Sequence, residues 1–429
     1  MGSPNRLCSI SLAAPFIFAV LLLNADLGSC DCFKRIFTFG DSITDAGNFA
    51  YTGRNNKNPG PPSVPPYGET YFHRPTGRAS DGRLIVDFYV RANVILFSSI
   101  SFIACVMRYN ISFIGLEKRI EPGRLVLGWV LLRRSKPPAI RACLHAQSLG
   151  LPLLPPSLPK ENTGQFPAGA NFALYGATAL NPNFFKRYNF GVPFTWSLDD
   201  QLATFKKVLA RIAPGDAATK SLLSESLIVF GEIGGNDYNF WFFAGHGGDT
   251  HTPEQYMPDV IARIGDGVQE VINLGAKTVL VPGNFPIGCV PAYLSGNKSN
   301  KSADYDQYHC LKRFNNFSQM HNQLLKQEVG KLKSLNADVK IIYADYYGAF
   351  MEFVKNPSRY GIDDPLVACC GGNGPYGTGH TCNQTARICP DPSRFASWDQ
   401  VHMTEKAYSV IANGVLNGPY ADTPLLDVC

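Results

Sequence analysis

Three residues whose types can form a nucleophile, a base and an orienting acid are far apart in the chain: Ser42, Asp399 and His402. A serine hydroxyl is a weak nucleophile at its own pKa, so it needs an adjacent base and a third group that holds the base. Asp399 and His402 are three residues apart, which lets a carboxylate contact an imidazole on one helical turn and fix its tautomer. Taken alone, the same residues also fit a helix cap at Ser42 and a surface pair or partial metal site at Asp399 and His402. The chemistry therefore depends on whether the fold brings them together.

The sequence around Ser42 has the form of a strand followed by a tight turn. Residues 35–39 are strand formers, and Gly40 after them permits a close approach of the backbone. The side chains of Asp45 and Asn48 can bond nearby amides. We expect Ser42 to open the following helix with its hydroxyl exposed.

Two further segments offer donors for the tetrahedral oxyanion of ester hydrolysis, which needs hydrogen bonds already in place. Asn236 follows two glycines directly after the predicted strand 226–230, so its side-chain amide can face the site. Gly176, within residues 171–177, offers its backbone N–H. Glycine and asparagine also dominate tight turns, and a plain turn is the alternative interpretation of residues 234–237.

Short strand-forming runs alternate with longer helical patterns. We expect strands at 35–39, 226–230, 278–282 and 339–343, and helices at 197–212, 253–274, 304–335 and 404–415. Such alternation predicts parallel strands joined by crossover helices, with the site at the carboxyl ends of the strands. Ser42, Asn236 and Asn284 all follow predicted strand ends. The proline-dense residues 59–66 predict a loop, which we expect to rim the site.

The composition and the first thirty residues are those of an exported globular protein. The chain has 429 residues, 45% of them hydrophobic, which suffices for a large core. Residues 1–30 have the parts of a signal peptide: a basic residue, an apolar stretch at 10–23, and small residues. A membrane anchor is the alternative, but the apolar stretch is shorter than the roughly 20 residues of a membrane span.

Residues 92–145 differ from the rest of the chain. They carry eight basic residues against Glu117 and Glu121, a net charge of +6, so that the other residues sum to −1 of the chain's total of +5. The segment begins inside an expected helix and has neither capping residues at its borders nor a sustained helical period. A basic membrane-surface or nucleic-acid segment is the alternative, and its apolar run at 94–107 is too short to span a membrane. We expect an insert, from a retained intron or a gene-model error, that interrupts a single domain of residues 31–429.

Export favours disulfides over zinc sites. Eight of the twelve cysteines lie outside the signal peptide and residues 92–145: Cys32, Cys289, Cys310, Cys369, Cys370, Cys382, Cys389 and Cys429. Because no CxxC spacing occurs, we expect a disulfide framework, whose pairing the sequence leaves open. Glycosylation sequons at Asn110, Asn297, Asn300, Asn316 and Asn383 agree with export.

Four segments stand in a fixed order: Gly40-Asp41-Ser42, Gly176 within 171–177, Gly235-Asn236-Asp237, and Asp399-Gln400-Val401-His402. Together they resemble the signature blocks of the GDSL esterase/lipases, also called SGNH hydrolases. Residues 39–48, 65–70, 73–78, 80–83 and 369–371 are similar to the secreted plant branch of that family. The resemblance covers the chain from Cys32 to the C-terminus apart from residues 92–145.

The resemblance implies an α/β fold, the three-layer α/β/α sandwich of SGNH hydrolases with a mostly parallel central sheet. It implies Ser42 as nucleophile, His402 as general base and then acid, and Asp399 as its orienting carboxylate. The implied oxyanion hole consists of the Ser42 N–H, the Gly176 N–H and the Asn236 side chain. The implied activity is hydrolysis of a small-molecule or lipid carboxylic ester through an acyl-serine intermediate, without metal or organic cofactor.

Two alternatives remain: acyl transfer to an alcohol by the same residues, and a product whose catalysis the insert impairs. The expected location is extracellular, in the apoplast or cell wall. We expect no nucleic-acid partner and no stable membrane anchor, and the oligomeric state stays open.

Overall fold

The computed structural model describes residues 33–53, 60–95, 116–121, 124–129, 153–244 and 252–428, with the backbone alone for 91–95, 116–121 and 124–129. The predicted signal peptide, Cys32, Cys429 and Asn110 lie outside the described residues. Of the helices in the described ranges, none is long and apolar enough to cross a membrane.

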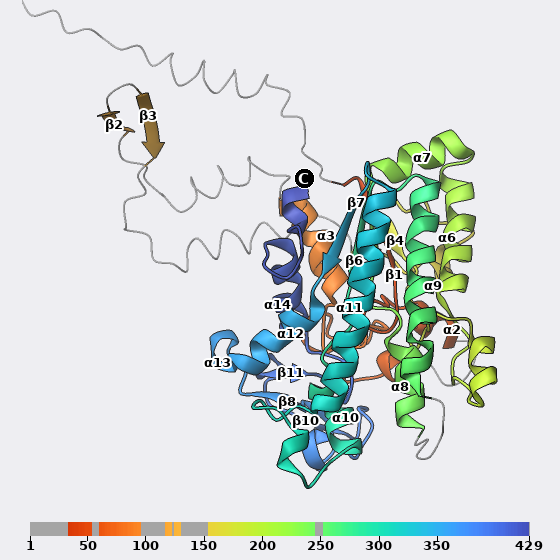
Figure 1. Ribbon diagram of the computed structural model, residues 1–429, viewed down its shortest axis with the longest axis vertical. Helices are drawn as coiled ribbons and strands as arrows, with labels where there is room; N and C mark the ends of the chain where they lie inside the picture. Colours follow the sequence, from red (N-terminus) through yellow and green to blue (C-terminus); the bar gives the residue numbers. More distant parts are fainter. Residues whose placement is uncertain are drawn as a thin grey trace, which may run out of the picture.

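A five-stranded parallel sheet forms the centre of the fold (Figure 1), with the strand order β4-β1-β5-β6-β7. The strands are β1 (Arg35–Phe39), β4 (Gly169–Asn171), β5 (Ser226–Phe230), β6 (Thr278–Pro282) and β7 (Lys340–Ala344). The four expected strands are confirmed, the last displaced by one residue. The edge strand β4 is too short to leave a pattern in the sequence. Because Phe39 pairs with Phe230, the carboxyl ends of β1 and β5 meet at one edge.

Successive side chains of each strand enter two different cores, as the period of two in a strand requires. Phe37 and Phe39 pack on one face of the sheet with α6, α9 and α11, whereas Ile36 packs on the other with α3, α12 and α14. The first face carries α6 (Leu198–Ile212), α9 (Pro253–Leu274) and α11 (Lys312–Leu335), and the second carries α3 (Ile85–Ile95), α12 (Tyr346–Lys355) and α14 (Glu405–Leu416). The expected three-layer α/β/α sandwich is confirmed.

Smaller elements complete the fold. The remaining helices are α2 (Asn48–Gly53), α7 (Asp216–Ser224), α8 (Gly235–Phe243), α10 (Pro291–Gly296) and α13 (Pro357–Tyr360). Two short strand pairs join β8 (Asp364–Ala368) to β11 (Phe395–Ser397) and β9 (Cys370–Gly371) to β10 (Arg387–Ile388). Disulfides link Cys369 to Cys389 and Cys370 to Cys382 in this region, and Cys289 to Cys310 elsewhere. Six of the eight expected cysteines are therefore paired.

The helix expected at 304–335 begins only at Lys312. Before it, Cys310 is tied to Cys289 by a disulfide, and the Asp306 carboxylate accepts the N–H groups of Tyr308 and Cys310 at 2.9 and 3.0 Å. A side chain that bonds its own neighbouring amides competes with helix formation. The helical expectation for residues 304–311 was therefore wrong.

Helix α3 continues to Ile95, past the expected start of the insert at Ala92. Within residues 92–145, β2 (Leu116–Glu121) and β3 (Arg124–Trp129) pair antiparallel and form a two-stranded sheet of their own (Figure 1). The boundaries and the origin of this segment stay a prediction.

Candidate active site

Ser42 lies in a turn directly after β1, and α2 begins only at Asn48, so the expectation that Ser42 opens a helix was wrong. The reason is Asp45, whose buried carboxylate accepts the N–H groups of Gly47, Asn48 and Phe49 at 2.7 to 3.0 Å. Asp45 therefore caps α2, and burial raises its pKa to about 6. Ser42 is left at the mouth of a cavity, 6% exposed.

The residue before this turn is held by a side chain that the sequence did not single out. Gln201 of α6 accepts the Gly40 N–H at 2.9 Å and donates to the Gly40 carbonyl at 2.8 Å. Gly40 has a φ of 139°, a conformation that favours glycine. Helix α6 therefore fixes the point at which the chain leaves β1 for Ser42.

Ser42, His402 and Asp399 form a continuous hydrogen-bonded chain. His402 Nε2 lies 2.8 Å from Ser42 Oγ, and His402 Nδ1 lies 2.7 Å from Asp399 Oδ2. Asp399 Oδ1 also accepts the N–H groups of Val401 and His402 at 2.8 and 2.7 Å, which closes the loop before α14. All three predicted residues are buried and in contact, although Ser42 and His402 are separated by 360 positions.

Electrostatics keep the Asp399 carboxylate ionised. Burial by itself would raise its pKa, but the facing His402 and the hydrogen bonds from His402 and Val401 outweigh burial and lower that pKa below its ordinary value. Tyr67 donates a further hydrogen bond to Asp399 Oδ2 at 2.7 Å. Burial, followed by the Asp399 charge, raises the pKa of Tyr67 well above its usual range, so the phenol keeps its proton. Tyr67, which the motifs do not include, is thus a fourth member of this hydrogen-bonded chain.

The three expected oxyanion donors surround Ser42. Across the described ranges, the backbone N–H groups of Ser42 and Gly176 find no acceptor, and both residues line the cavity. Gly176 has a φ of 76°, and a Cβ atom there would lie 2.1 Å from the Phe194 ring, so glycine is required. The Asn236 amide donates to Asp41 Oδ2 at 2.8 Å and to the Ala177 carbonyl at 3.1 Å, so both of its hydrogens are engaged.

The cavity at Ser42 has a volume of about 350 Å³. Apart from the polar residues already named, its walls are largely apolar, with Phe240, Phe285, Ile287, Val290 and Tyr293 among them. The proline-dense segment contributes Pro61, so it rims the site as expected, but Pro61–Ser63 form a short 3-10 helix where a loop was expected.

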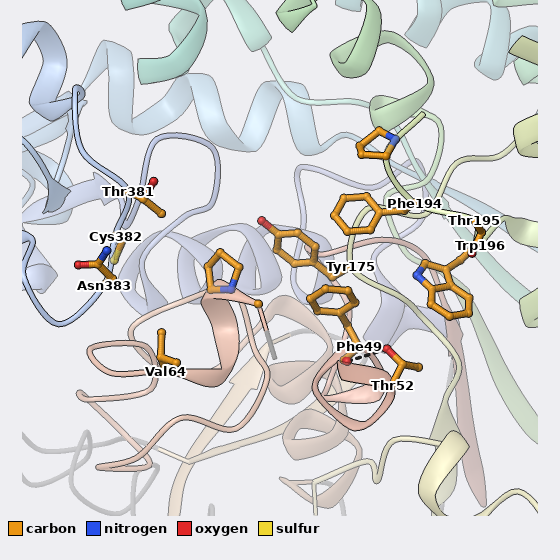
Figure 2. Close-up of a pocket in the computed structure, with 13 residues that line it drawn as sticks. Phe49, Thr52, Val64, Tyr175, Phe194, Thr195, Trp196, Thr381, Cys382 and Asn383 are labelled. Atoms are coloured by element: carbon orange, nitrogen blue, oxygen red, sulfur yellow. Dashed lines mark hydrogen bonds between the residues drawn. The ribbon is translucent and has the colours of Figure 1, made fainter. Parts of the chain in front are cut away.

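A second hollow of about 640 Å³ lies beside this cavity and shares Pro61, Tyr175 and Phe194 with it. Figure 2 shows the rings of Phe49, Tyr175 and Phe194 grouped together, with Trp196 beyond them and Thr381 and Asn383 on the opposite side. We call this hollow the aromatic groove. The Tyr175 ring is stacked 5.1 Å from Phe49 and lies 5.4 Å from the His402 ring. The groove therefore reaches the active-site histidine through Tyr175.

The chain is similar to known proteins over most of its length. A family model described as GDSL-like Lipase/Acylhydrolase matches residues 132–415. A GDSL esterase/lipase of Arabidopsis thaliana is 37% identical over 99% of this chain and 94% of its own length. The sinapine esterase of Brassica napus is 37% identical over 95% of this chain and 91% of its own length.

The family match covers more than half of the chain, and the relatives extend over nearly all of it, including the turn at Ser42. The chain therefore belongs to the GDSL esterase/lipase family and is a carboxylic-ester hydrolase.

Proposed function

We propose that the protein hydrolyses esters through an acyl-serine intermediate formed on Ser42, with His402 as base and acid and Asp399 as the carboxylate that orients it. The observation that carries the proposal is the hydrogen-bonded chain from Ser42 Oγ through His402 to Asp399, at 2.8 and 2.7 Å. This is the arrangement that activates a serine hydroxyl.

The reaction has two halves with the same proton path. Ser42 Oγ attacks the ester carbonyl while its proton passes to His402 Nε2, and the tetrahedral intermediate then expels the alcohol, which takes that proton. Water next attacks the acyl-serine, His402 Nε2 accepts one of its protons, and the proton returns to Ser42 Oγ as the carboxylic acid leaves. Asp399 stays ionised throughout and stabilises the imidazolium.

The oxyanion receives hydrogen bonds from the N–H groups of Ser42 and Gly176, and from Asn236 as the third donor. Because both Asn236 hydrogens are engaged, one bond must yield. The bond to the Ala177 carbonyl is the longer of the two and joins neutral groups, so it is the one that exchanges for the oxyanion.

The position of His402 sets how the ester lies. The leaving alcohol must face His402 to receive its proton, so the acyl group extends to the other side of Ser42, into the apolar cavity lined by Phe240 and Phe285. The alcohol side leads past Tyr175 into the aromatic groove. We therefore propose esters with an apolar acyl group and an aromatic alcohol.

The test of the mechanism is Ser42→Ala, assayed on p-nitrophenyl acetate. We expect kcat/KM to fall about 10⁴-fold or more, and a fluorophosphonate probe to label the Ser42 peptide of the wild-type protein and not of the variant. Ser295→Ala, which removes a hydroxyl outside the triad, is the matched control. Retention of the rate by Ser42→Ala would refute the assignment. To distinguish acyl transfer from hydrolysis, the reaction is repeated with an added alcohol, and formation of a new ester is measured.

The test of the substrate class compares acetates of a phenol and of ethanol. Trp196→Ala removes an aromatic wall of the groove, so KM for the aryl ester should rise about 3- to 10-fold, while KM for the ethyl ester stays the same. Equal effects on both esters would place the alcohol elsewhere.

We propose in addition that the protein is secreted. Three disulfides support this location because they persist in oxidising compartments. Asn300 and Asn316, two of the sequon asparagines, are exposed, and Asn297 and Asn383 are half-buried. Expression of the full chain in plant cells should deliver a glycosidase-sensitive protein to the medium, and retention inside the cells would contradict the proposal.

We also propose that residues 92–145 are an insertion into a single hydrolase domain. The buried part of α3, including Tyr89 and Val90, packs in the same core as α14, the helix that follows His402. A disturbance of α3 would thus reach the active site. Mass spectrometry of the secreted protein should find no peptide from this segment, and detection of such peptides in active enzyme would refute the idea. Deletion of residues 92–145 should preserve or raise kcat.

A further inference from the structure

Two buried carboxyl groups line the same cavity as Ser42, and the mechanism above uses neither. Asp41 follows β1 and Glu232 follows the neighbouring strand β5, and their exposed fractions are 2% and 5%. The Asp41 N–H donates to the Glu232 carbonyl at 3.0 Å, and each of the two carboxyl groups affects the pKa of the other. Two interacting carboxylates in a buried site repel each other when both are ionised, whereas a pair that keeps one proton can form a hydrogen bond.

Each carboxyl group also holds a different part of the site. Asp41 Oδ1 accepts the Ile43 N–H at 2.9 Å, and Asp41 Oδ2 accepts the Asn236 amide at 2.8 Å. Glu232 Oε1 accepts the Gly235 N–H at 3.0 Å, and a Cβ atom on Gly235 would lie only 2.7 Å from that oxygen. The pair therefore connects the turn of Ser42 to the turn of Asn236.

Several titratable groups interact electrostatically with the pair. They are Asp237, Tyr175, Tyr238, Tyr293, Tyr346 and Tyr408, while His402, bonded to Asp399, lines the same cavity. Burial, followed by the charge and hydrogen bond of Glu232, raises the pKa of Asp41 well above its usual range, and burial also raises the pKa of Glu232. Both shifts favour a pair that keeps a proton.

We propose that Asp41 and Glu232 are positioning residues that share a single proton and thereby hold the Asn236 amide in register with Ser42. The inference rests on the proposed role of Asn236 in the oxyanion hole. Loss of the shared proton would leave two facing negative charges in a buried site, which would repel each other and oppose the charge of the oxyanion. The rate should therefore fall on the alkaline side as the pair ionises.

Two variants of Glu232 separate the shared proton from packing. In Glu232→Gln, the amide can donate to ionised Asp41 while its oxygen keeps the Gly235 N–H, so the pair has no second proton to lose on the alkaline side. We expect kcat at pH 7 within about threefold of wild type and no alkaline fall. In Glu232→Ala, the hydrogen bond to the Gly235 N–H and the interaction with Asp41 are both lost. We expect kcat to fall about 10- to 100-fold with KM nearly unchanged.

The measurement is kcat and KM by pH-stat across the pH range in which the melting temperature shows each protein folded. An alkaline fall that persists in Glu232→Gln, a Glu232→Gln rate as low as that of Glu232→Ala, or a wild-type rate in Glu232→Ala overturns the proposal. Ser42→Ala separates the two hypotheses: if it is inactive while Glu232→Ala is not impaired, the triad stands and the pair has no positioning role.

Infrared spectroscopy of the wild-type protein tests the shared proton without any variant. At about pH 9, Asp45 and Asp237 are ionised because burial raises their pKa values only to about 6 and about 7. A protonated-carboxyl carbonyl band that remains at this pH is the expected result. Absence of the band overturns the proposal.

Discussion

Among the described histidines, two are buried to a similar extent, yet their partners differ. His402 is 4% exposed and His321, on α11, is 1% exposed. His402 has a carboxylate at Nδ1 and the Ser42 hydroxyl at Nε2. His321 Nδ1 is paired with the Tyr238 hydroxyl at 2.9 Å, and burial lowers the pKa of His321 to about 4.

The difference shows what burial alone does to an imidazole. Without a negative partner, desolvation keeps His321 neutral, and the ring serves as a packing and hydrogen-bonding group. In the proposed mechanism, Asp399 supplies His402 with a charge that stabilises the protonated ring formed during the reaction. The carboxylate, rather than burial, distinguishes the proposed catalytic base from a structural histidine.

The largest effect on the difference between the two histidines is expected when His402 has a neutral partner. Asp399→Asn should lower kcat about 10⁴-fold, because the amide favours the wrong tautomer and cannot stabilise the imidazolium. Esterase assays measure the loss, with His321→Gln as the matched control that stays within a few-fold of wild type. If Asp399→Asn kept more than a tenth of the rate, the comparison would fail.

The low pKa of His321 should make the free energy of unfolding fall in acid. Its pKa is about 4 when folded and 6.5 in the ordinary state, so between these values the unfolded chain binds more protons and stability falls as the pH falls. The contribution is about 3 kcal/mol over the whole interval. Urea unfolding at pH 7.5 and 4.5 should show a smaller loss for His321→Gln than for wild type.

Equal losses in the two proteins would mean that His321 does not titrate in this way. The difference in stability loss between His321→Gln and wild type separates the contribution of His321 from the contributions of Asp45 and Asp237. Burial raises the pKa values of these two groups. Their contribution to the free energy of unfolding therefore changes in the opposite direction and is lost as the pH rises from about 4 towards 6 and 7.

A smaller change on the catalytic side is Tyr67→Phe, which removes a hydrogen bond to the charged Asp399. Bonds to charged groups contribute about 1.5 to 3 kcal/mol, so kcat should fall about tenfold, with the melting temperature as the check on folding. An unchanged kcat would show that Asp399 is oriented without Tyr67.

The matched change on the structural side is Tyr238→Phe, which removes the partner of His321. We expect a loss of about 1 kcal/mol in the free energy of unfolding and a kcat within twofold of wild type. A fall in kcat as large as that of Tyr67→Phe would connect His321 to catalysis.

The sequence predicted four of the five strands of the sheet, because strand patterns are local. The resemblance of four local motifs to a known family implied the contact of Ser42 with His402. The supports of the site arise from contacts between distant segments. Gln201 reaches Gly40 across 161 positions, and Tyr67 reaches Asp399 across 332. No local period signals such pairs, and Gln201 belongs to an ordinary amphipathic helix. The position of Ser42 in a turn was mispredicted because Asp45 caps α2 in its place.

The 360 positions between Ser42 and His402 have a consequence for the biosynthesis of the protein. Chains are synthesised from the N-terminus, and long-range contacts form late in folding. The nucleophile, the central strands and most helices are complete while His402 is still to be synthesised. In the proposed mechanism, a nascent chain or any fragment that ends before β11 therefore lacks its base, and we expect hydrolysis only when the segment that carries His402 has folded.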